Sequence, residues 1–413
     1  MNRKWLLTVA ICCLMGIGAS AQPSGNSTED DWWKLERFSG DWNGWRTRWA
    51  ERGVEFTIDY TSEIMSNVSG GSLRGTIYEG LGYVGVDADL NRLAGWNGGA
   101  FHVSTMWIHG ASPGNYAGNE LAVSNIDAYD GLRLHQVFVE QEFGQLSLRT
   151  GSLLADEDFV PSMYREVFLN DSFGQTVSWS ANTLNGGPAF FAAGLGLRAL
   201  YEFNDAWYAQ AGVYDGDIYD DASDDPTINQ HGVHFELGNG QGWTSMYQVG
   251  YNGFNVSDGT DLPGWYRLTA WYHSSVFDKH DGSKSNGITG VFASVDQLVC
   301  REEVDQGLGV FGRFGISERD RARFHWTFDA GLHYTGLIPG RADDVTGLAL
   351  IYGKHSSEIT TTKSHEYVAE MTYQFQLSPA IYLQPAVQYI NRPSGDSTVD
   401  DAWVFGLRAG FTF

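Results

Sequence analysis

The last twelve residues of the chain, 402–413, alternate between two kinds of side chain. The apolar row contains Trp403, Phe405, Leu407, Ala409, Phe411 and Phe413. The row between them is small or polar, and its one charge is Arg408. Period two predicts a β-strand with two unlike faces. Aromatic residues at both ends of the apolar row favour a strand of an outer-membrane barrel, whose aromatics lie at the two lipid–water interfaces. This stretch alone leaves a soluble β-sandwich equally open.

Similar alternation continues almost without a break from residue 54 onward. In 54–63, 82–90, 207–214 and 367–377, apolar residues at every second position oppose acids, amides, glycines or hydroxyls. Short turns alternate with long polar connections, the long ones being 110–131, 155–190, 215–231, 274–286 and 391–401. Short turns at one end and long loops at the other are typical of a bacterial porin. A count of candidate strands gives about 17, which must be corrected to an even number, and the weakest alternation lies in 232–273.

The N-terminal residues divide into two further segments. Residues 1–21 read as a secretory signal peptide, with Arg3 and Lys4 before an apolar stretch and an Ala-x-Ala cleavage site at 19–21. We expect 22–53 to be a periplasmic segment with a short helix over 43–52, which Asp41 caps and Gly53 ends. The remainder, 54–413, is the predicted barrel.

Composition excludes several classes of protein. With 26 basic and 50 acidic residues the net charge is −24, which argues against nucleic acid as a partner. Beyond the predicted signal peptide, no apolar run approaches the roughly 20 residues that a membrane helix needs. Only Cys300 follows the signal peptide, so no internal disulfide can form.

Seven segments, in order along the chain, carry a resemblance to a known family. They are 39–56, 81–104, 149–174, 207–217, 306–315, 329–350 and 400–413. Together they resemble the carbohydrate-selective porin family (OprB-type) from about residue 35 to the end. The resemblance implies an all-β, antiparallel transmembrane barrel of about 16 strands (16–18), with one loop folded into its lumen. It also implies passive uptake of sugars across the outer membrane of a Gram-negative bacterium. Cys300 and the acidic loop 215–225 depart from the family's pattern.

Arginines on the inward rows are the first candidates for contact with a sugar. Forked polar groups suit vicinal hydroxyls, and these arginines are Arg149, Arg198, Arg313 and Arg408. Carboxylates occupy matching rows, for example Asp59, Glu63 and Glu370. The alternative is that these charges only pair with one another in a polar interior. We expect at least two of the arginines to touch solute.

The stretch 155–190 is the candidate constriction, because it is too long for an ordinary hairpin loop. Its candidate pore-lining residues are Asp156, Glu157, Arg165, Glu166 and Trp179. Arg74, in the predicted first loop 67–80, is expected to face this stretch. The alternative places 155–190 across the barrel mouth, where it would only stabilise the rim.

The remaining motifs point to no enzyme, cofactor or metal. The acidic loop 215–225 lacks the spacing of a calcium loop and is better read as a solvated loop near lipopolysaccharide. Gly307-x-Gly309-x-x-Gly312 matches a dinucleotide fingerprint by letter, but no helix follows it. Two other functions stay open: a general or anion-preferring porin, and an outer-membrane glycoside hydrolase using the carboxylates of 156–158. Expected partners are sugars, outer-membrane lipid and lipopolysaccharide, and the barrel-assembly machinery through Phe413, while a homotrimer is left open.

Overall fold

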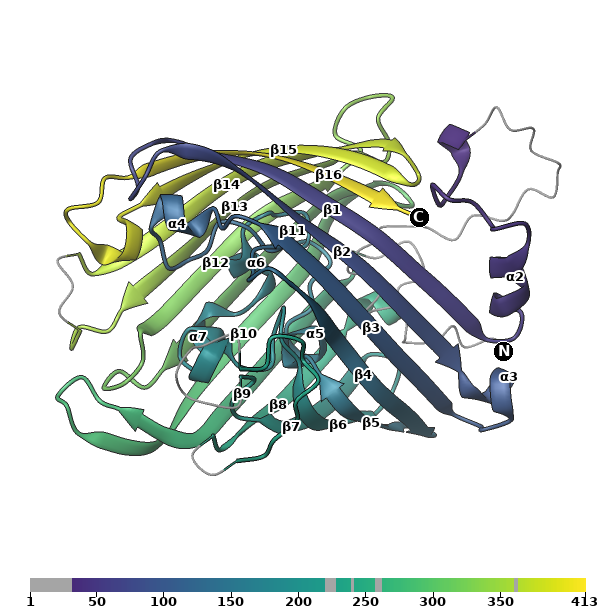
Figure 1. Ribbon diagram of the computed structural model, residues 1–413, viewed down its shortest axis with the longest axis horizontal. Helices are drawn as coiled ribbons and strands as arrows, with labels where there is room; N and C mark the ends of the chain where they lie inside the picture. The colour runs from purple at the N-terminus through teal and green to yellow at the C-terminus, as the bar shows by residue number, and fades with distance from the viewer. Residues whose placement is uncertain (1–31, 220–227, 239–240, 257–261, 360–362) are drawn as a thin grey trace.

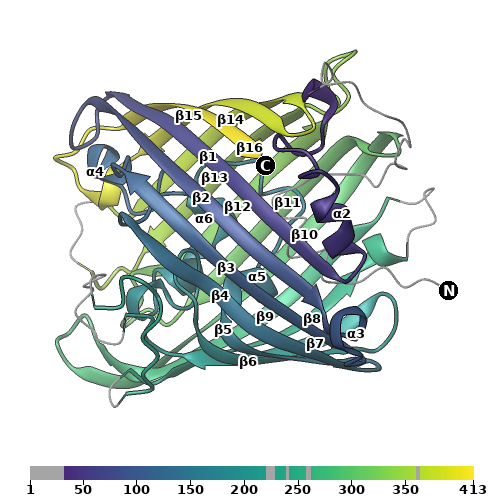
Figure 2. The same ribbon diagram turned by 45° about the vertical axis from the view of Figure 1, so that its right-hand side comes forward.

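The computed structural model describes residues 32–219, 228–238, 241–256, 262–359 and 363–413. Within them, sixteen antiparallel strands form one closed barrel, in which each strand pairs with its sequence neighbours and β1 pairs with β16 (Figures 1 and 2). The predicted fold class and even strand number are therefore confirmed. The strands are β1 (Val54–Ser69), β2 (Gly75–Asp89), β3 (Gly99–Gly110), β4 (Gly131–Phe143), β5 (Leu146–Leu153), β6 (Gly194–Glu202), β7 (Trp207–Asp215), β8 (Trp243–Asn252), β9 (Gly264–Asp278), β10 (Lys284–Glu303), β11 (Gln306–Ser317), β12 (Phe324–Thr335), β13 (Val345–His355), β14 (His365–Ser378), β15 (Ile381–Asn391) and β16 (Ala402–Thr412).

Short helices occur only in the connections and in the N-terminal segment of the described chain. They are η1 (Trp32–Lys34), α2 (Trp45–Ala50), α3 (Leu90–Ala94), α4 (Gly114–Ala117), α5 (Ala155–Phe159), α6 (Asp171–Gly174), α7 (Val177–Ser180), η2 (Leu184–Gly186), η3 (Gly253–Asn255) and η4 (Pro393–Gly395). None of the described helices has the length and apolar content needed to span a bilayer.

The predicted bounds of two loops, 67–80 and 274–286, are wrong. The strands β1 and β2 extend to Ser69 and from Gly75, so the first connection is only 70–74 rather than 67–80. Likewise β9 runs to Asp278 and β10 begins at Lys284, which leaves 279–283 instead of 274–286. In both cases glycines and polar residues at the strand ends resemble a loop in sequence. The weak stretch 232–273 contributes β8 and most of β9.

The two faces of the C-terminal strand lie as the alternation predicts. Trp403, Phe405 and Leu407 are 42–50% exposed on the outer surface, whereas Arg408 is 6% exposed on the inner one. In β15, Pro385 also faces outward, and because proline lacks a ladder donor a local bulge could accompany it. The structure shows no register shift at Pro385: the pairs Thr372–Ala386 and Phe375–Leu383 belong to one register, with unpaired positions between them.

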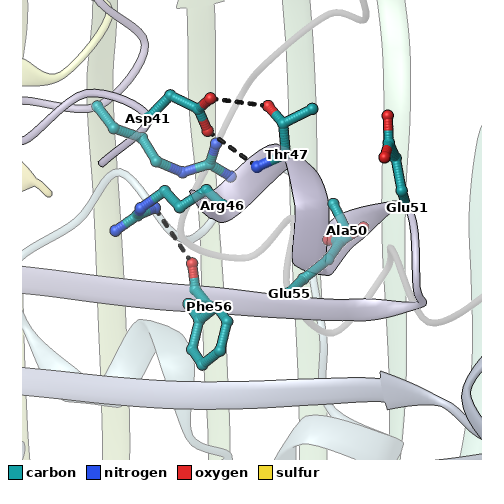
Figure 3. A pocket seen from close by; sticks show the side chains of 8 residues that line it. Asp41, Arg46, Thr47, Ala50, Glu51, Glu55 and Phe56 are labelled. Carbon is teal, nitrogen blue, oxygen red and sulfur yellow. Dashed lines mark hydrogen bonds between the residues drawn. The ribbon is translucent and has the colours of Figure 1, made fainter. Parts of the chain in front are cut away.

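The N-terminal segment lies at the end of the barrel where the chain terminates (Figures 1 and 2). Helix α2 is shorter than predicted, and its N-cap is Gly44 and not Asp41, although the Asp41 carboxylate accepts a hydrogen bond from the Thr47 backbone N at 2.9 Å. A cavity of about 410 Å³ separates this helix from the start of β1, and Arg46 crosses it to donate to the Phe56 carbonyl (Figure 3). Arg46 also donates to the carbonyl of Phe413 at 2.6 Å, so the two ends of the described chain are joined. The predicted signal peptide, 1–21, lies outside the described residues.

Candidate functional site

The connection between β5 and β6, residues 154–193 and here called L3, lies inside the barrel. Its helices α5, α6 and α7 are seen within the ring of strands in Figure 1. Tyr164 and Phe168 pack over inward-facing positions of β11 and β13. Another interior segment is L2, residues 111–130 between β3 and β4, whose Asn125 N donates to the Leu169 carbonyl of L3 at 2.6 Å. The sequence predicted an inward role only for 155–190; L2 was missed.

Inward-facing amides hold the backbone of L3. Backbone polar groups inside a protein need partners, and a loop in a lumen cannot obtain them from a sheet. Gln210 Nε2 donates to the Asp158 carbonyl at 2.6 Å, and Gln248 Nε2 donates to the Phe159 carbonyl at 2.7 Å. On the far wall, Gln384 Nε2 donates to the Val167 carbonyl at 2.5 Å. The side-chain N–H groups of these inward amides are therefore already used in hydrogen bonds to L3.

Inward-facing carboxylates accept hydrogen bonds from the backbone N–H groups of the interior loops. Glu370 on β14 accepts hydrogen bonds from the Leu169 and Asn170 N–H groups at 2.7 and 2.9 Å. Glu366, four residues earlier on the same face of β14, accepts hydrogen bonds from the N–H groups of Glu120 and Leu121 in L2 at 2.8–3.1 Å. Both glutamates are fully buried. They anchor the two interior loops and do not face the passage.

Inward glycines make room for L3. A Cβ on Gly309 of β11 would lie 2.3 Å from the Tyr164 ring, and one on Gly347 of β13 would lie 2.9 Å from the Phe168 ring. Such distances exclude any side chain unless L3 moves. Gly309, one of the glycines that match the dinucleotide fingerprint by letter, thus leaves the space that the Tyr164 ring of L3 occupies.

The inward arginines share their charge with carboxylates in four groups. Arg149 and Arg198 both contact Glu140 and Asp158, with N–O distances of 2.8–3.3 Å. Arg267 pairs with Asp296 at 2.5 Å, and Arg165 and Arg313 share Asp329 at 3.1 and 2.7 Å. The fourth group is Arg408 with Glu63. For most of these arginines, the structure therefore matches the alternative in which the inward charges pair with one another.

The predicted lining residues differ in how much of their side-chain surface is exposed inside the barrel. Arg165, Arg313 and Arg408 are 2–6% exposed, and Trp179 has no exposed surface. Trp179 packs among buried apolar residues of L3 and the wall, so the structure gives it a supporting place. Asp156, Glu157 and Glu166 keep part of their surface inside the barrel. Arg74 is exposed in the loop 70–74, and no described contact joins it to L3.

Three predicted residues, Arg149, Glu157 and Arg198, do come together. They line a cavity of about 110 Å³ between L3 and the ends of β4, β6 and β8 that lie near the short turns. Tyr208 and Trp265 also line it, and the Trp265 indole N donates to the Tyr208 hydroxyl at 3.1 Å. An aromatic pair beside forked charged groups is the combination that a polyhydroxylated ring requires.

Glu157 is a titratable residue of this cavity whose pKa is strongly raised. Burial, and after it the charges of Asp156 and Asp158, raise the pKa of Glu157 to about 8. The hydrogen bond that Gln136 Nε2 donates to Glu157 at 2.8 Å and the charge of Arg149 act in the other direction. At neutral pH the carboxyl is therefore largely protonated, and it can both donate to and accept from a hydroxyl group.

Three further carboxyls of the barrel wall and the interior loops lie outside the predicted set: Glu79 of β2, Asp127 of L2 and Asp171 of L3. Glu79 is 3% exposed and pairs directly across the sheet with Glu63. Burial raises the pKa of Asp127 to about 6 and that of Asp171 to about 8. The sequence did not identify Glu79 because the predicted first loop, 67–80, contains it, although Glu79 falls on the inward row of β2. Among the described residues, no group of three or more His, Cys, Asp or Glu is arranged to hold a metal ion.

Comparison with known proteins agrees with this geometry. The family model described as "Carbohydrate-selective porin, OprB family" matches residues 74–413. The chain belongs to this family. Porin B of Pseudomonas aeruginosa is 23% identical over 97% of this chain and 95% of its own length. The putative porin QuiX of Acinetobacter baylyi is 24% identical over 96% of this chain and 98% of its own. The high-pH structure of Pseudomonas putida OprB superimposes with a TM-score of 0.82 at 21% identity, covering 92% of this chain and 99% of that one.

This OprB-family chain is an outer-membrane porin of a Gram-negative bacterium and serves the passage of carbohydrates. The barrel's apolar outer rows face lipid. The fold and family indicate a channel rather than an enzyme.

Proposed function

We propose that this porin passes monosaccharides and small oligosaccharides, and that the cavity lined by Arg149, Glu157, Arg198, Tyr208 and Trp265 is a sugar subsite beneath L3. The cavity carries the proposal. It joins two aromatic rings, two arginines and a carboxyl that is mostly neutral near pH 7. A neutral polyol gains from many hydrogen-bond partners, and a neutral carboxyl provides them without attracting ions.

Asp156 and Glu166 are proposed as the edge of the constriction. Asp156 accepts a hydrogen bond from the Phe190 N at 3.0 Å and keeps one oxygen without a hydrogen-bond partner. Arg165, Arg313 and Arg408 are proposed to act indirectly by holding L3 and L2 in place.

A liposome-swelling series with glucose, maltose, an amino acid and an organic acid of similar size tests the function. Sugar selectivity predicts that glucose enters faster than the organic acid and the amino acid at equal size. Rates that follow size alone would support a general porin instead, and faster entry of the organic acid would support an anion-preferring one.

An enzyme assay separates the hydrolase alternative. Turnover of a glycoside that disappears in Asp156→Asn or Glu157→Gln would assign a catalytic role to these carboxyls, whereas a pure channel gives no turnover in any variant.

The C-terminal strand is the segment that we propose for recognition by the barrel-assembly machinery. Its apolar row ends at Phe413, whose backbone N donates to the Ile58 carbonyl of β1 at 2.8 Å in the closed barrel. Deletion of Phe413 is expected to lower the amount of folded barrel in the outer membrane. Whether the barrel forms a homotrimer stays a prediction, which the mass of the detergent-solubilised particle tests.

A further inference from the structure

The N-terminal segment before β1 packs aromatic side chains against the outer surface of the barrel. Trp42, Trp45 and Trp49 pack around Phe56 of β1, with ring centroids 5.9–6.5 Å from that of Phe56. Phe56 belongs to the same row of β1 as Ile64, which is 49% exposed on the outer surface. The three tryptophans therefore continue the lipid-facing row of β1 beyond the end of the strand.

A second contact of the same kind lies beside β16. The Phe38 ring packs edge-on against the Phe413 ring, with centroids 5.8 Å apart, and the Phe38 backbone N donates to the Thr412 carbonyl at 2.7 Å. Phe413 ends the apolar row of β16, whose Trp403 and Phe405 are exposed on the outer surface. Both aromatic contacts of the segment therefore lie at the lipid-facing edge of the barrel.

Much of this aromatic surface stays exposed. Trp45 is 43% exposed and Phe38 is 44% exposed. Other aromatic residues with exposures of 42–60% lie at short turns of the same end of the barrel, namely Phe143, Tyr201, Phe203 and Trp207. Tryptophan and tyrosine favour membrane–water interfaces, where barrels carry girdles of aromatic residues. The exposed surface of the segment is therefore continuous with the aromatic girdle at this end.

The charges of the segment suit a lipid headgroup region. The described residues before β1, 32–53, hold five basic and three acidic side chains, although the net charge of the chain is −24. Arg48 lies between Trp45 and Trp49 on α2, and the Arg52 guanidinium lies 5.6 Å from the centre of the Trp49 ring. Both arginines are exposed, and no described ion pair involves either of them. Basic side chains beside an apolar face strengthen binding to anionic lipid.

The other side of helix α2 is polar and lies at the cavity. Thr47 and Glu51, four residues apart, line this cavity together with Glu55, which belongs to the inward row of β1 (Figure 3). Helix α2 therefore has an aromatic, basic side at the lipid and a polar side at the opening of the barrel. Such a division is typical of helices that lie in the plane of a membrane interface.

We infer that residues 38–52 are a membrane-interface anchor, which binds the phospholipid leaflet at the short-turn end of the barrel. The three tryptophans lie among the lipid headgroups, and Arg48 and Arg52 lie beside lipid phosphates. An apolar face of this kind is buried roughly 5–10 Å into the boundary between headgroups and acyl chains. The anchor also keeps Arg46 at the rim, where its guanidinium donates to the Phe413 carbonyl at 2.6 Å.

Fluorescence quenching by lipid tests this inference in vesicles of phosphatidylethanolamine and phosphatidylglycerol that contain brominated phospholipid. Cys300→Ser removes the exposed native thiol, and a fluorescent label is then attached to Trp45→Cys, Glu51→Cys or Trp207→Cys. The label at 207 is the reference for lipid contact, and the label at 51 is the reference for the polar side of α2. Brominated lipid should quench the label at 45 about as strongly as the label at 207, and at least about threefold more than the label at 51.

Heat-modifiable gel migration checks that each labelled barrel is folded. Arg48→Cys leaves every aromatic contact in place, and its label repeats the measurement on the same side of α2 if Trp45→Cys does not fold. Folded barrels in which the label at 207 is quenched, but the labels at 45 and 48 are quenched no more than the label at 51, would overturn the anchor.

The role of the two arginines is tested separately. Arg48→Gln/Arg52→Gln should lower the quenching of the label at 45. Arg92→Gln is the matched control and should leave the quenching unchanged, because it removes an exposed arginine that already pairs with Asp89 at 3.2 Å. Equal quenching in these two variants would exclude lipid phosphate as the partner of Arg48 and Arg52.

Discussion

The inner wall of this porin has two unlike parts. From β7 to β15 many polar side chains are engaged with the interior loops. Amides bind loop carbonyls, Glu370 binds N–H groups of L3 and Glu366 those of L2, and Arg313 donates to the carbonyls of Ser172 and Gln175 at 2.8 Å each. On the wall of β1 and β2, Glu79 and Glu63 each keep one oxygen without a hydrogen-bond partner, although the other oxygen of Glu63 pairs with Arg408. An inward polar residue is thus not by itself a solute contact. What matters is whether an interior loop has already used its hydrogen bonds.

The largest effect is expected where L3 is fixed most firmly. Arg313→Ala removes the bond to Asp329 and leaves buried loop carbonyls without a donor, at a cost of about 3–5 kcal/mol in folding free energy. The temperature at which the barrel loses its heat-modifiable gel migration should fall, and protease should cut within 154–193. A variant with wild-type stability and an uncut L3 would mean that Arg313 does not hold the loop.

A smaller effect is expected from overfilling the seat of L3. Gly347→Ala places a Cβ 2.9 Å from the Phe168 ring, and overpacking of this kind costs about 1–3 kcal/mol. L3 should shift into the passage and lower single-channel conductance. Gly174→Ala is the matched control, because a Cβ at Gly174 of L3 meets nothing within 4 Å. Equal conductance in both variants would argue against a close fit between L3 and β13.

The opposite part of the wall is tested by pH. Asp127 and Asp156 have a pKa of about 6, while Asp171 and Glu157 have a pKa of about 8, all raised chiefly by burial. These groups lose protons as pH rises from 5.5 to 9, so the passage becomes more negative and its K⁺ over Cl⁻ preference should increase. Reversal potentials in a KCl gradient measure this.

The double variant Glu157→Gln/Asp171→Asn should flatten the upper part of that profile. The charged neighbours of Glu157 are Asp156, Asp158 and Arg149, and those of Asp171 are Asp156, Asp127 and Arg313. Since both sets remain in the variant, a profile that keeps its full slope above pH 7 would assign the change to them.

The barrel was predictable because its signal is local. Alternation along β16 and β14 fixes which residues face outward, and the outward exposure of Trp403, Phe405 and Leu407 follows it. Strand ends were predicted less well, since Gly75 and Gly80 in β2 have the composition of a loop while the backbone continues the ladder with β1 and β3.

The site was predictable only in part. The sequence identified Arg149, Glu157 and Arg198, which the structure gathers around one cavity, because each belongs to a polar row or to an unusually long loop. It could not distinguish them from Arg313 or Arg408. Arg313 donates to carbonyls of L3 that lie 140 and 141 residues away in the chain, and Arg408 donates to Glu63 of β1, 345 residues away. Such pairings depend on the path of L3 and L2 through the lumen, which no local pattern encodes.

The smallest effect is expected at Arg74. Its side chain is exposed in the loop 70–74 and forms no described bond to L3, so its charge is screened by solvent. Arg74→Ala should weaken sugar block of the single-channel current by less than about twofold, which corresponds to at most about 0.4 kcal/mol. Glu157→Ala removes both the hydrogen-bond donor and the acceptor of the neutral carboxyl from the cavity and should weaken the block more, by about fivefold. If Arg74→Ala has the larger effect of the two, the sugar is held at the outer mouth and not beneath L3.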